Sequence, residues 1–329
     1  RDAQESRGLG DVYKRQFQIT GKQASDDVNV WSLVTGFVLL VVGILVLLFI
    51  RDRFYVLNMF GLYSQREIGD KQNVKQLKLN DYKIRERFID FVNVFNMGID
   101  EKTNSIIVNK IEEECTKFKD RSAEFQKGFT GTAPIPYTIL AGTYLVDCEP
   151  KIFFEWKRED EKFIQLSTKK KANFPELKIK EMDNPNVNAE SIIVAISTTR
   201  RIKKHQLKDF GEQDIIEIYL DDCKDNNITY IKQLQNYRKV ILDELEALGR
   251  KNYPHLNQIN LVASIPSCMS LEMGRMIAQN NNRVKKIVAY HFVNQGTKLY
   301  PFGIAVTESQ GQYKNCLLYT SDAADDLIG

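Results

Sequence analysis

The feature that most limits how this chain can fold is an uncharged apolar run at residues 31–50, which reads WSLVTGFVLLVVGILVLLFI. At about 1.5 Å per residue, a helix of this length spans the roughly 30 Å of hydrocarbon in a lipid bilayer. A signal peptide has a shorter apolar run that ends in small residues, whereas this run ends in bulky side chains followed by Arg51 and Arg53. The run therefore predicts one transmembrane helix, with a buried core helix as the alternative.

The charges on either side of the run predict its orientation. Basic residues outnumber acidic ones in residues 51–85, whereas residues 17–30 contain one lysine and two aspartates. Positive charges favour the cytoplasmic side of a membrane. We therefore expect residues 17–50 to be an outside loop followed by the span, residues 51–84 to be an interfacial linker, and the remaining domain to lie in the cytoplasm.

The two ends of the sequence do not continue the hydrophobic patterns of their neighbours. Residues 1–16 and 316–329 are similar to translated sequencing adapter, and we expect both to lie outside the fold. The soluble domain is then expected to end near residue 315.

Charge and cysteine content exclude several classes of function. The chain has 46 lysines and arginines against 43 aspartates and glutamates, a net charge of +3. No face or run is basic enough to bind a long nucleic acid, because such binding requires many phosphates to be neutralised. The cysteines inside the two ends lie singly in apolar stretches, at Cys115, Cys148, Cys223 and Cys268. They are expected to be reduced core thiols and not metal ligands.

Short apolar runs alternate with amphipathic segments in the second part of the chain. Strands are predicted at residues 191–197, 215–220 and 258–264, and helices at 228–248 and from Pro266 to about residue 279. Two further runs, 286–292 and 298–306, flank a polar turn that contains Gly296, and they predict an antiparallel hairpin. This alternation is typical of a Rossmann-like α/β unit with an antiparallel finish.

The preceding part of the chain repeats this order. PIPYTILAG at residues 134–142 matches PSCMSLEMG at residues 266–274 in its first proline and last glycine. Each block is followed by a strand, a polar turn and a second strand, and residues 87–96 and 106–118 supply a first strand and helix upstream. The shared order predicts an internal duplication, with halves at residues 85–166 and 191–315 and a charged connector at residues 167–190.

These blocks resemble SAVED domains. INLVASIPSCMSLEMGRMI, VKKIVAYHF and LYPFGIAV are similar to their C-terminal half, and TGTAPIPYTILAGTYL followed by IFFEW to their N-terminal half. The resemblance covers about residues 85–310. It implies an α/β fold of two fused CARF-like halves that bind a cyclic oligonucleotide, expected to be a trinucleotide, supplied by a nucleotidyltransferase.

A transmembrane helix on such a domain is similar to effectors of CBASS anti-phage defence. The resemblance implies that the ligand drives self-association into filaments or rings, and that the assembly disrupts the bacterial inner membrane. The partners expected are therefore the cyclic nucleotide, the lipid bilayer and further copies of the chain.

Candidate ligand residues lie at strand ends, because ligands of open α/β sheets bind outside the carboxyl ends of the strands. Small hydroxyl side chains let a backbone approach phosphodiesters, arginines pair with phosphate, and a helix N-terminus favours an anion. The alternatives are an ordinary helix cap for each serine or threonine and a core position for the tryptophan. The candidates are Thr130, Thr132, Trp156, Ser197, Thr198, Thr199, Arg200, Arg201, Ser264 and Ser267.

Signals for catalysis are weak. His205, His255 and His291 lie far apart in the sequence, and no hydrolase, phosphate-loop or zinc-protease motif occurs. Asp221 and Asp222 follow a strand, where a solvated strand end is favoured over a metal site. We therefore expect a sensor that is not an enzyme and holds no metal, with an enzyme that degrades the cyclic ligand and a passive scaffold as alternatives.

Overall fold

A computed structural model describes residues 30–49, 52–64, 66–157, 159–169, 173–280, 283–294 and 296–316, which fall into two compact units, Arg1–Arg51 and Asp52–Gly329. In the first unit, α2 (Val30–Phe49) is one helix, and its described side chains, residues 31–45, are all exposed. No helix within the described residues is long and apolar enough to cross a membrane. The end of the predicted span, the residues before Val30, and residues 317–329 lie outside the described residues.

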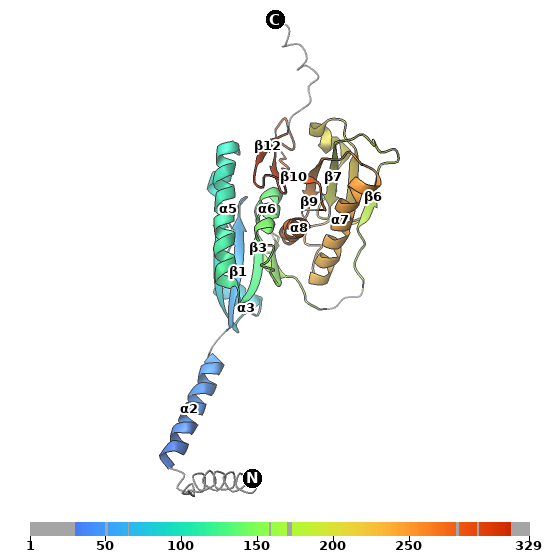
Figure 1. Ribbon diagram of the computed structural model, residues 1–329. Coiled ribbons are helices and arrows are strands. Elements are labelled where there is room, and N and C mark those ends of the chain that lie inside the picture. The colour runs from blue at the N-terminus through green and yellow to red at the C-terminus, as the bar shows by residue number, and fades with distance from the viewer. Residues whose placement is uncertain are drawn as a thin grey trace, which may run out of the picture. The chain divides into compact units, whose positions relative to one another are not determined.

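The second unit contains two sheets, and the first has the strand order β2-β1-β3-β4-β5. The first four strands in this order are parallel, and β5 closes an antiparallel hairpin with β4. The elements are β1 (Asp52–Phe60), α3 (Lys71–Gln76), β2 (Tyr82–Asp90), α4 (Val92–Asn96), α5 (Glu101–Ser122), β3 (Gln126–Gly131), α6 (Ile135–Tyr144), β4 (Ile152–Lys157) and β5 (Lys162–Gln165) (Figure 1).

The prediction that residues 51–84 form an interfacial linker is wrong. Strand β1 lies between β2 and β3 and pairs with both, and its side chains Phe54, Val56 and Met59 are fully buried. The segment after the apolar run contains the aromatic residues Phe54, Tyr55, Phe60 and Tyr63, and such residues are typical both of a membrane interface and of a buried strand. The first half therefore begins at β1 and not at residue 85. The strand predicted at residues 87–96 is also corrected, because β2 ends at Asp90 and the short helix α4 follows it.

The second sheet has seven strands in the order β12-β11-β10-β9-β7-β8-β6. The strands β10, β9, β7 and β8 are parallel, and the outer strands β6, β11 and β12 are antiparallel to their neighbours. The elements are β6 (Lys178–Lys180), β7 (Ser191–Ser197), η1 (Lys204–Phe210), β8 (Ile215–Tyr219), α7 (Ile231–Lys251), β9 (Gln258–Ser264), α8 (Ser267–Gln279), β10 (Lys286–His291), β11 (Phe302–Ala305) and β12 (Tyr313–Asn315).

The boundaries of this second half differ from the predicted ones at two places. The connector at residues 167–190 contributes β6, which pairs with β8 at the edge of the sheet. Cys316, the first residue of the tail expected to be adapter, is buried, and its carbonyl accepts a hydrogen bond of 2.8 Å from Lys298 Nζ.

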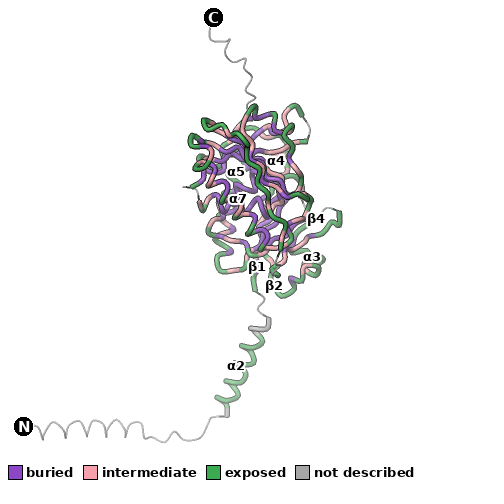
Figure 2. Tube along the Cα trace, turned by 90° about the vertical axis from the view of Figure 1, so that its right-hand side faces the viewer, coloured by how far each residue is buried: buried purple, intermediate pink, exposed green. Residues whose placement is uncertain are grey.

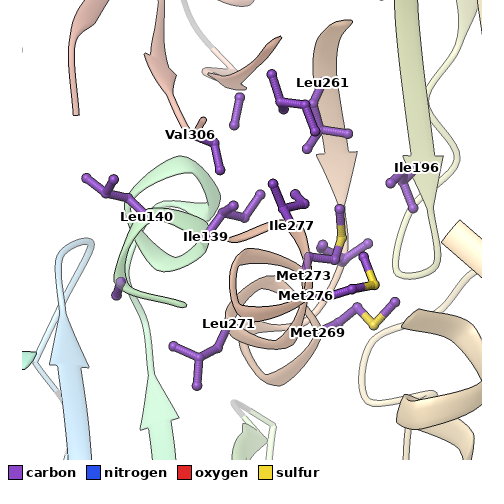
Figure 3. Close-up of a cluster of buried hydrophobic side chains, with 14 of the residues drawn as sticks. Ile139, Leu140, Ile196, Leu261, Met269, Leu271, Met273, Met276, Ile277 and Val306 are labelled. Carbon is purple, nitrogen blue, oxygen red and sulfur yellow. The ribbon is translucent and has the colours of Figure 1, made fainter. Parts of the chain in front are cut away.

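The two halves share the order predicted by the repeat. Strand β3, helix α6 and the β4–β5 hairpin correspond to β9, α8 and the β10–β11 hairpin. Helices α6 and α8 lie side by side between the two sheets (Figure 1), and Ile139, Met273 and Ile277 project from them into one buried cluster (Figure 3). Buried residues run through the middle of this unit (Figure 2).

The repeated glycines lie where α6 and α8 cross. A Cβ atom on Gly142 would stand 2.2 Å from the Leu271 carbonyl oxygen, and one on Gly274 would stand 1.8 Å from the Ile139 carbonyl oxygen. Real Cβ atoms do not approach a backbone oxygen so closely. The two helices therefore touch backbone to backbone, and each repeat contributes the glycine that allows it.

A buried arginine joins the halves beside this crossing. The Arg275 side chain is 4% exposed, and its Nε and Nη2 atoms donate to the carbonyl oxygens of Leu145 (3.1 Å) and Val146 (3.3 Å) just after α6. Glu272 supplies the compensating carboxylate, 2.6 Å from Arg275 Nη1. Since a buried charge is costly unless it is paired and hydrogen-bonded, this group has one favourable arrangement, which helps set how the halves meet.

Gly274→Ala is expected to lower the free energy of unfolding by about 3 kcal/mol, at the upper end of the usual cost of overpacking a core. The control is Gly249→Ala, also within a helix, where the added Cβ would contact the flexible Lys285 side chain and helix propensity favours alanine by up to about 1 kcal/mol. Chemical denaturation of both variants measures the difference. Equal stability of the two would show that α6 and α8 do not touch at these glycines.

Candidate functional site

A cavity of about 450 Å³ lies at the carboxyl ends of parallel strands from both halves. Its first wall follows β1 and β3 and consists of Leu62, Ala133, Pro134 and Ile135. Its second wall follows β7, β9 and β10 and comprises Thr199, Arg200, Arg201, Ile202, Lys203, His205, Gln206, Ala263, Ser264, Ile265, Tyr290, His291, Phe292 and Asn294, with Tyr300. The cavity therefore lies where ligands of open α/β sheets bind, and neither half forms it alone.

The ends of β7 and β9 form one hydrogen-bonded corner of the cavity. Thr199 Oγ1 and Ser264 Oγ are 2.8 Å apart, and Ser264 Oγ also accepts the backbone N–H of Arg200 at 3.1 Å. The backbone N–H groups of Thr198 and Thr199 both donate to the Ser264 carbonyl oxygen at 2.9 Å. These bonds fix the start of the basic segment that follows β7.

The charge of the described lining is entirely positive. It includes Arg200, Arg201 and Lys203 and no aspartate or glutamate. The charge of Arg201 is partly compensated within the chain. Its guanidinium pairs with Glu217 and lies over the Tyr219 ring, 3.2 Å from the ring centroid. Arg200 and Lys203 are exposed at the rim, where their charges can reach an anion that enters.

The aromatic side of the cavity is poorly solvated. Burial lowers the pKa of His291 from 6.5 to about 4, and its ring contacts those of Phe95 and Phe302 at centroid distances of 5.4 and 5.3 Å. Burial raises the pKa values of Tyr290 and Tyr300 above their ordinary value. At neutral pH His291 is therefore uncharged, and the positive charge comes from the arginines and the lysine.

Four of the predicted site residues line the cavity, namely Thr199, Arg200, Arg201 and Ser264. Two others lie just beneath it: Ser197 Oγ accepts the Ile202 N–H at 3.0 Å, and Thr198 is fully buried. In the first half Thr130 is buried within β3, and Thr132 Oγ1 donates to the Tyr63 carbonyl oxygen at 2.5 Å. These four hydroxyl residues shape strand ends and are not among the lining residues.

Ser267 and Trp156 are not among the lining residues. Glu155 of β4 caps the start of α8, accepting the Cys268 N–H at 2.7 Å and the Ser267 hydroxyl at 3.3 Å. Burial raises the pKa of the Glu155 carboxyl, although these hydrogen bonds oppose the shift. Trp156 packs edge-on against Phe163, with ring centroids 4.9 Å apart, so the core alternative describes it better.

Several lining residues were not predicted. Lys203, His205 and Gln206 continue the basic segment after Arg200 and could have been included from their proximity in sequence. Leu62, Pro134 and Asn294 approach them only through the tertiary fold. Pro134 was noted as a repeated residue, but nothing local to it indicated a ligand.

Metal chemistry has no visible basis in the described residues, where no group of three or more histidines, cysteines, aspartates or glutamates could hold a metal ion. The cysteines described are free thiols, and Cys115, Cys148 and Cys268 are buried.

Comparisons with known proteins identify one sequence family and several similar solved structures. A sequence model described as SAVED, "SMODS-associated and fused to various effectors sensor domain", matches residues 111–306. Solved structures of the Acinetobacter baumannii Cap4 SAVED/CARF-domain containing receptor are also similar. The one with the cyclic trinucleotide 2'3'3'-cAAA has 14% identity and a TM-score of 0.48, covering 79% of this chain and 50% of that one.

Two further structures of that receptor give similar values. The one with 3'3'3'-cAAA has 13% identity and a TM-score of 0.47 and covers 78% of this chain and 50% of that one. The receptor without a named ligand has 12% identity and a TM-score of 0.46, covering 77% and 49%. The present chain thus spans about half the length of these solved chains. No curated protein sequence matches it significantly.

The His291 environment predicts a pH dependence of stability. Because its pKa is about 4 in the folded chain and 6.5 when unperturbed, the unfolded chain binds the proton first. His291 thus contributes stability that is present above about pH 6.5 and lost as the pH falls towards 4. Denaturation at pH 7 and pH 5 should show a smaller loss for His291→Phe than for the wild type. The control is His255→Gln, at an exposed residue. If His291→Phe loses as much stability between pH 7 and pH 5 as the wild type does, the lowered pKa of His291 is contradicted.

Proposed function

This chain belongs to the SAVED family of sensor domains, and we propose that its cavity binds a cyclic oligonucleotide and that the full chain is a membrane-anchored effector of CBASS anti-phage defence. The single observation that supports binding most strongly is the positively charged cavity between the two halves, whose described lining contains no aspartate or glutamate. The cyclic ligand, for which a trinucleotide is the first candidate, comes from a nucleotidyltransferase.

The lining offers a partner for each part of a nucleotide. Arg200 and Lys203 supply charge-assisted hydrogen bonds to phosphates, and the backbone around Ser264 is held close to them. Phe292, which is partly exposed, provides aromatic surface, on which bases stack irrespective of their identity. A cyclic ligand would thus contact both walls and hold the two halves together.

The membrane part of the proposal rests on the sequence. The uncharged run at residues 31–50 and the basic residues after it support a span of the bacterial inner membrane with the sensor domain in the cytoplasm. One span is too small to conduct or disrupt anything by itself. Function therefore requires that the ligand bring many spans together.

The two-part cavity supports the proposed self-association. In this proposal, a ligand bound in the cavity of one chain creates a new surface between that chain's first half and the second half of the next chain. Such a head-to-tail contact extends into filaments, or closes into a ring if the rotation allows. Clustering raises the local concentration of anchors, and the small residues Ser32, Gly36 and Gly43 give the helices a face for close packing.

The second candidate function is degradation of the cyclic ligand. His205 and His291 both line the cavity, and histidines are the commonest groups for general acid–base catalysis. In this reading the chain lowers the messenger concentration, and the loss of cyclic ligand over hours is its signature. A passive scaffold, the third alternative, would have no nucleotide affinity.

Ligand binding is expected to stabilise the full chain against unfolding. At a free concentration of about 100 times Kd, a cyclic trinucleotide should raise the free energy of unfolding by about 2.7 kcal/mol. Arg200→Gln should weaken binding by about 1.5–3 kcal/mol, because it removes a charge-assisted phosphate bond. A panel of cyclic di-, tri- and tetranucleotides measured by thermal shift and titration tests both statements.

The matched control is Lys204→Gln, which removes the same charge from an exposed residue outside the described lining. If both variants weaken binding equally, general charge and not the cavity attracts the ligand. The absence of any shift up to millimolar concentrations would favour the scaffold.

Membrane disruption is expected only when the ligand is present. Liposomes that contain the full chain should release a trapped dye after the cyclic ligand is added, and light scattering should report large assemblies. Val41→Asp with Val42→Asp should abolish the leakage, since each charge costs about 2.5–3.5 kcal/mol at the centre of an inserted helix. Leakage without ligand, or binding to an unchanged monomer, would contradict ligand-driven assembly.

A further inference from the structure

A second concavity, of about 390 Å³, lies at the end of the first sheet away from the candidate site. It includes Arg53, near the amino end of β1, whereas Leu62 of the candidate site follows the carboxyl end of the same strand. At about 3.3 Å per residue, roughly 30 Å of strand separates these two residues. The two sites are therefore distinct.

The register of β1 and β2 explains why arginines gather here. Tyr55 pairs with Arg85, and Leu57 pairs with Arg87. Alternate residues of a strand share a face, so Arg53, Arg85 and Arg87 lie on one face of the sheet. Helix α5 adds Arg121 in its last turn, and all four arginines line the concavity.

These positive charges are incompletely balanced. Arg87 pairs with Glu114, but in the part of the chain that the structure describes no ion pair joins Arg53, Arg85 or Arg121 to a carboxylate. Like charges around one hollow repel, and a bound anion relieves the repulsion.

The acidic residue in the lining is directed elsewhere. Glu86 Oε1 accepts the Gly69 N–H at 2.6 Å, and its Oε2 accepts from Asn58 Nδ2 at 3.2 Å. Because Glu86 lies between Arg85 and Arg87 in a strand, its side chain belongs to the other face of the sheet. The hollow therefore presents guanidinium groups over an aromatic floor of Tyr55 and Phe118.

We propose that Arg53, Arg85, Arg87 and Arg121 form a second anion site, which binds the phosphate of an anionic phospholipid headgroup. The planar guanidinium matches a phosphate with two parallel hydrogen bonds, which supports the phosphate. The lipid source rests on the proposed span, because Arg53 lies only three positions after residues 31–50 and basic residues next to a span attract anionic lipids. The site would hold the sheet's amino end to the lipid surface, independently of the cyclic ligand.

The test uses the full chain in neutral detergent micelles doped with phosphatidylglycerol or phosphatidylcholine, and counts retained lipid by native mass spectrometry. The variant is Arg85→Gln with Arg121→Gln, at two exposed residues. The control, Arg250→Gln with Arg283→Gln, removes the same charge from exposed residues lining a separate hollow beside α7. We expect the wild type and the control to retain phosphatidylglycerol, and the variant to bind it about tenfold or more weakly.

Each other outcome contradicts a stated part of the proposal. Equal weakening in the control would show that net charge, and not this site, holds the lipid. Equal retention of both lipids by the wild type would exclude recognition of an anionic headgroup. If inorganic phosphate without lipid competes as well as phosphatidylglycerol, the anion is a soluble phosphate and the lipid source is wrong.

The same samples separate this proposal from the proposed function. The thermal shift caused by a cyclic trinucleotide should be unchanged in the Arg85 and Arg121 variant, because the two sites lie at opposite ends of β1. Loss of nucleotide binding in the wild type would contradict the proposed function alone. Membrane fractionation of the wild type tests the span itself.

Discussion

The backbone contact between α6 and α8 is the interaction on which the rest of the sensor domain depends. Each sheet needs a helix to cover its face, and the two helices meet at Gly142 and Gly274 without side chains between them. Both helices begin directly after strands that end at the cavity, since α6 follows Pro134 and α8 follows Pro266. The crossing therefore also determines how far apart the two cavity walls stand.

The two halves share an order of elements but contribute different kinds of residue to the cavity lining. All permanently charged residues described in the cavity lining, Arg200, Arg201 and Lys203, come from the second half, and the first half contributes apolar residues. A wall of each kind suits a ligand that carries phosphates on one side and flat, weakly polar bases on the other. The element order that the halves share supplies the geometry, and the residues after the strand ends supply the difference in polarity.

Much of this arrangement could be predicted from the sequence, and the failures have physical reasons. Strands 191–197 and 258–264 were predicted correctly because continuous β-branched runs are typical of strands buried on both faces. The repeated proline and glycine anticipated the element order that the two halves share, and the SAVED resemblance is confirmed by the family match. Strand β1 was missed because an aromatic run after a membrane-like segment has the same local composition as an interfacial anchor.

The site was harder to predict than the fold. A serine or threonine at a strand end has the same sequence signature whether it lines a cavity, as Ser264 does, or accepts a neighbouring backbone N–H, as Ser197 does. The opposing wall at Leu62 and Pro134 reaches Arg200 only after both sheets have formed and packed, so no local pattern contains it.

The crossing that brings these walls together also has a consequence during synthesis. Gly274 leaves the ribosome 132 residues after Gly142, and at about 5–20 residues per second this interval lasts about 7 to 26 seconds. For that time the face of α6 that packs against α8 in the folded chain is uncovered on the nascent first half.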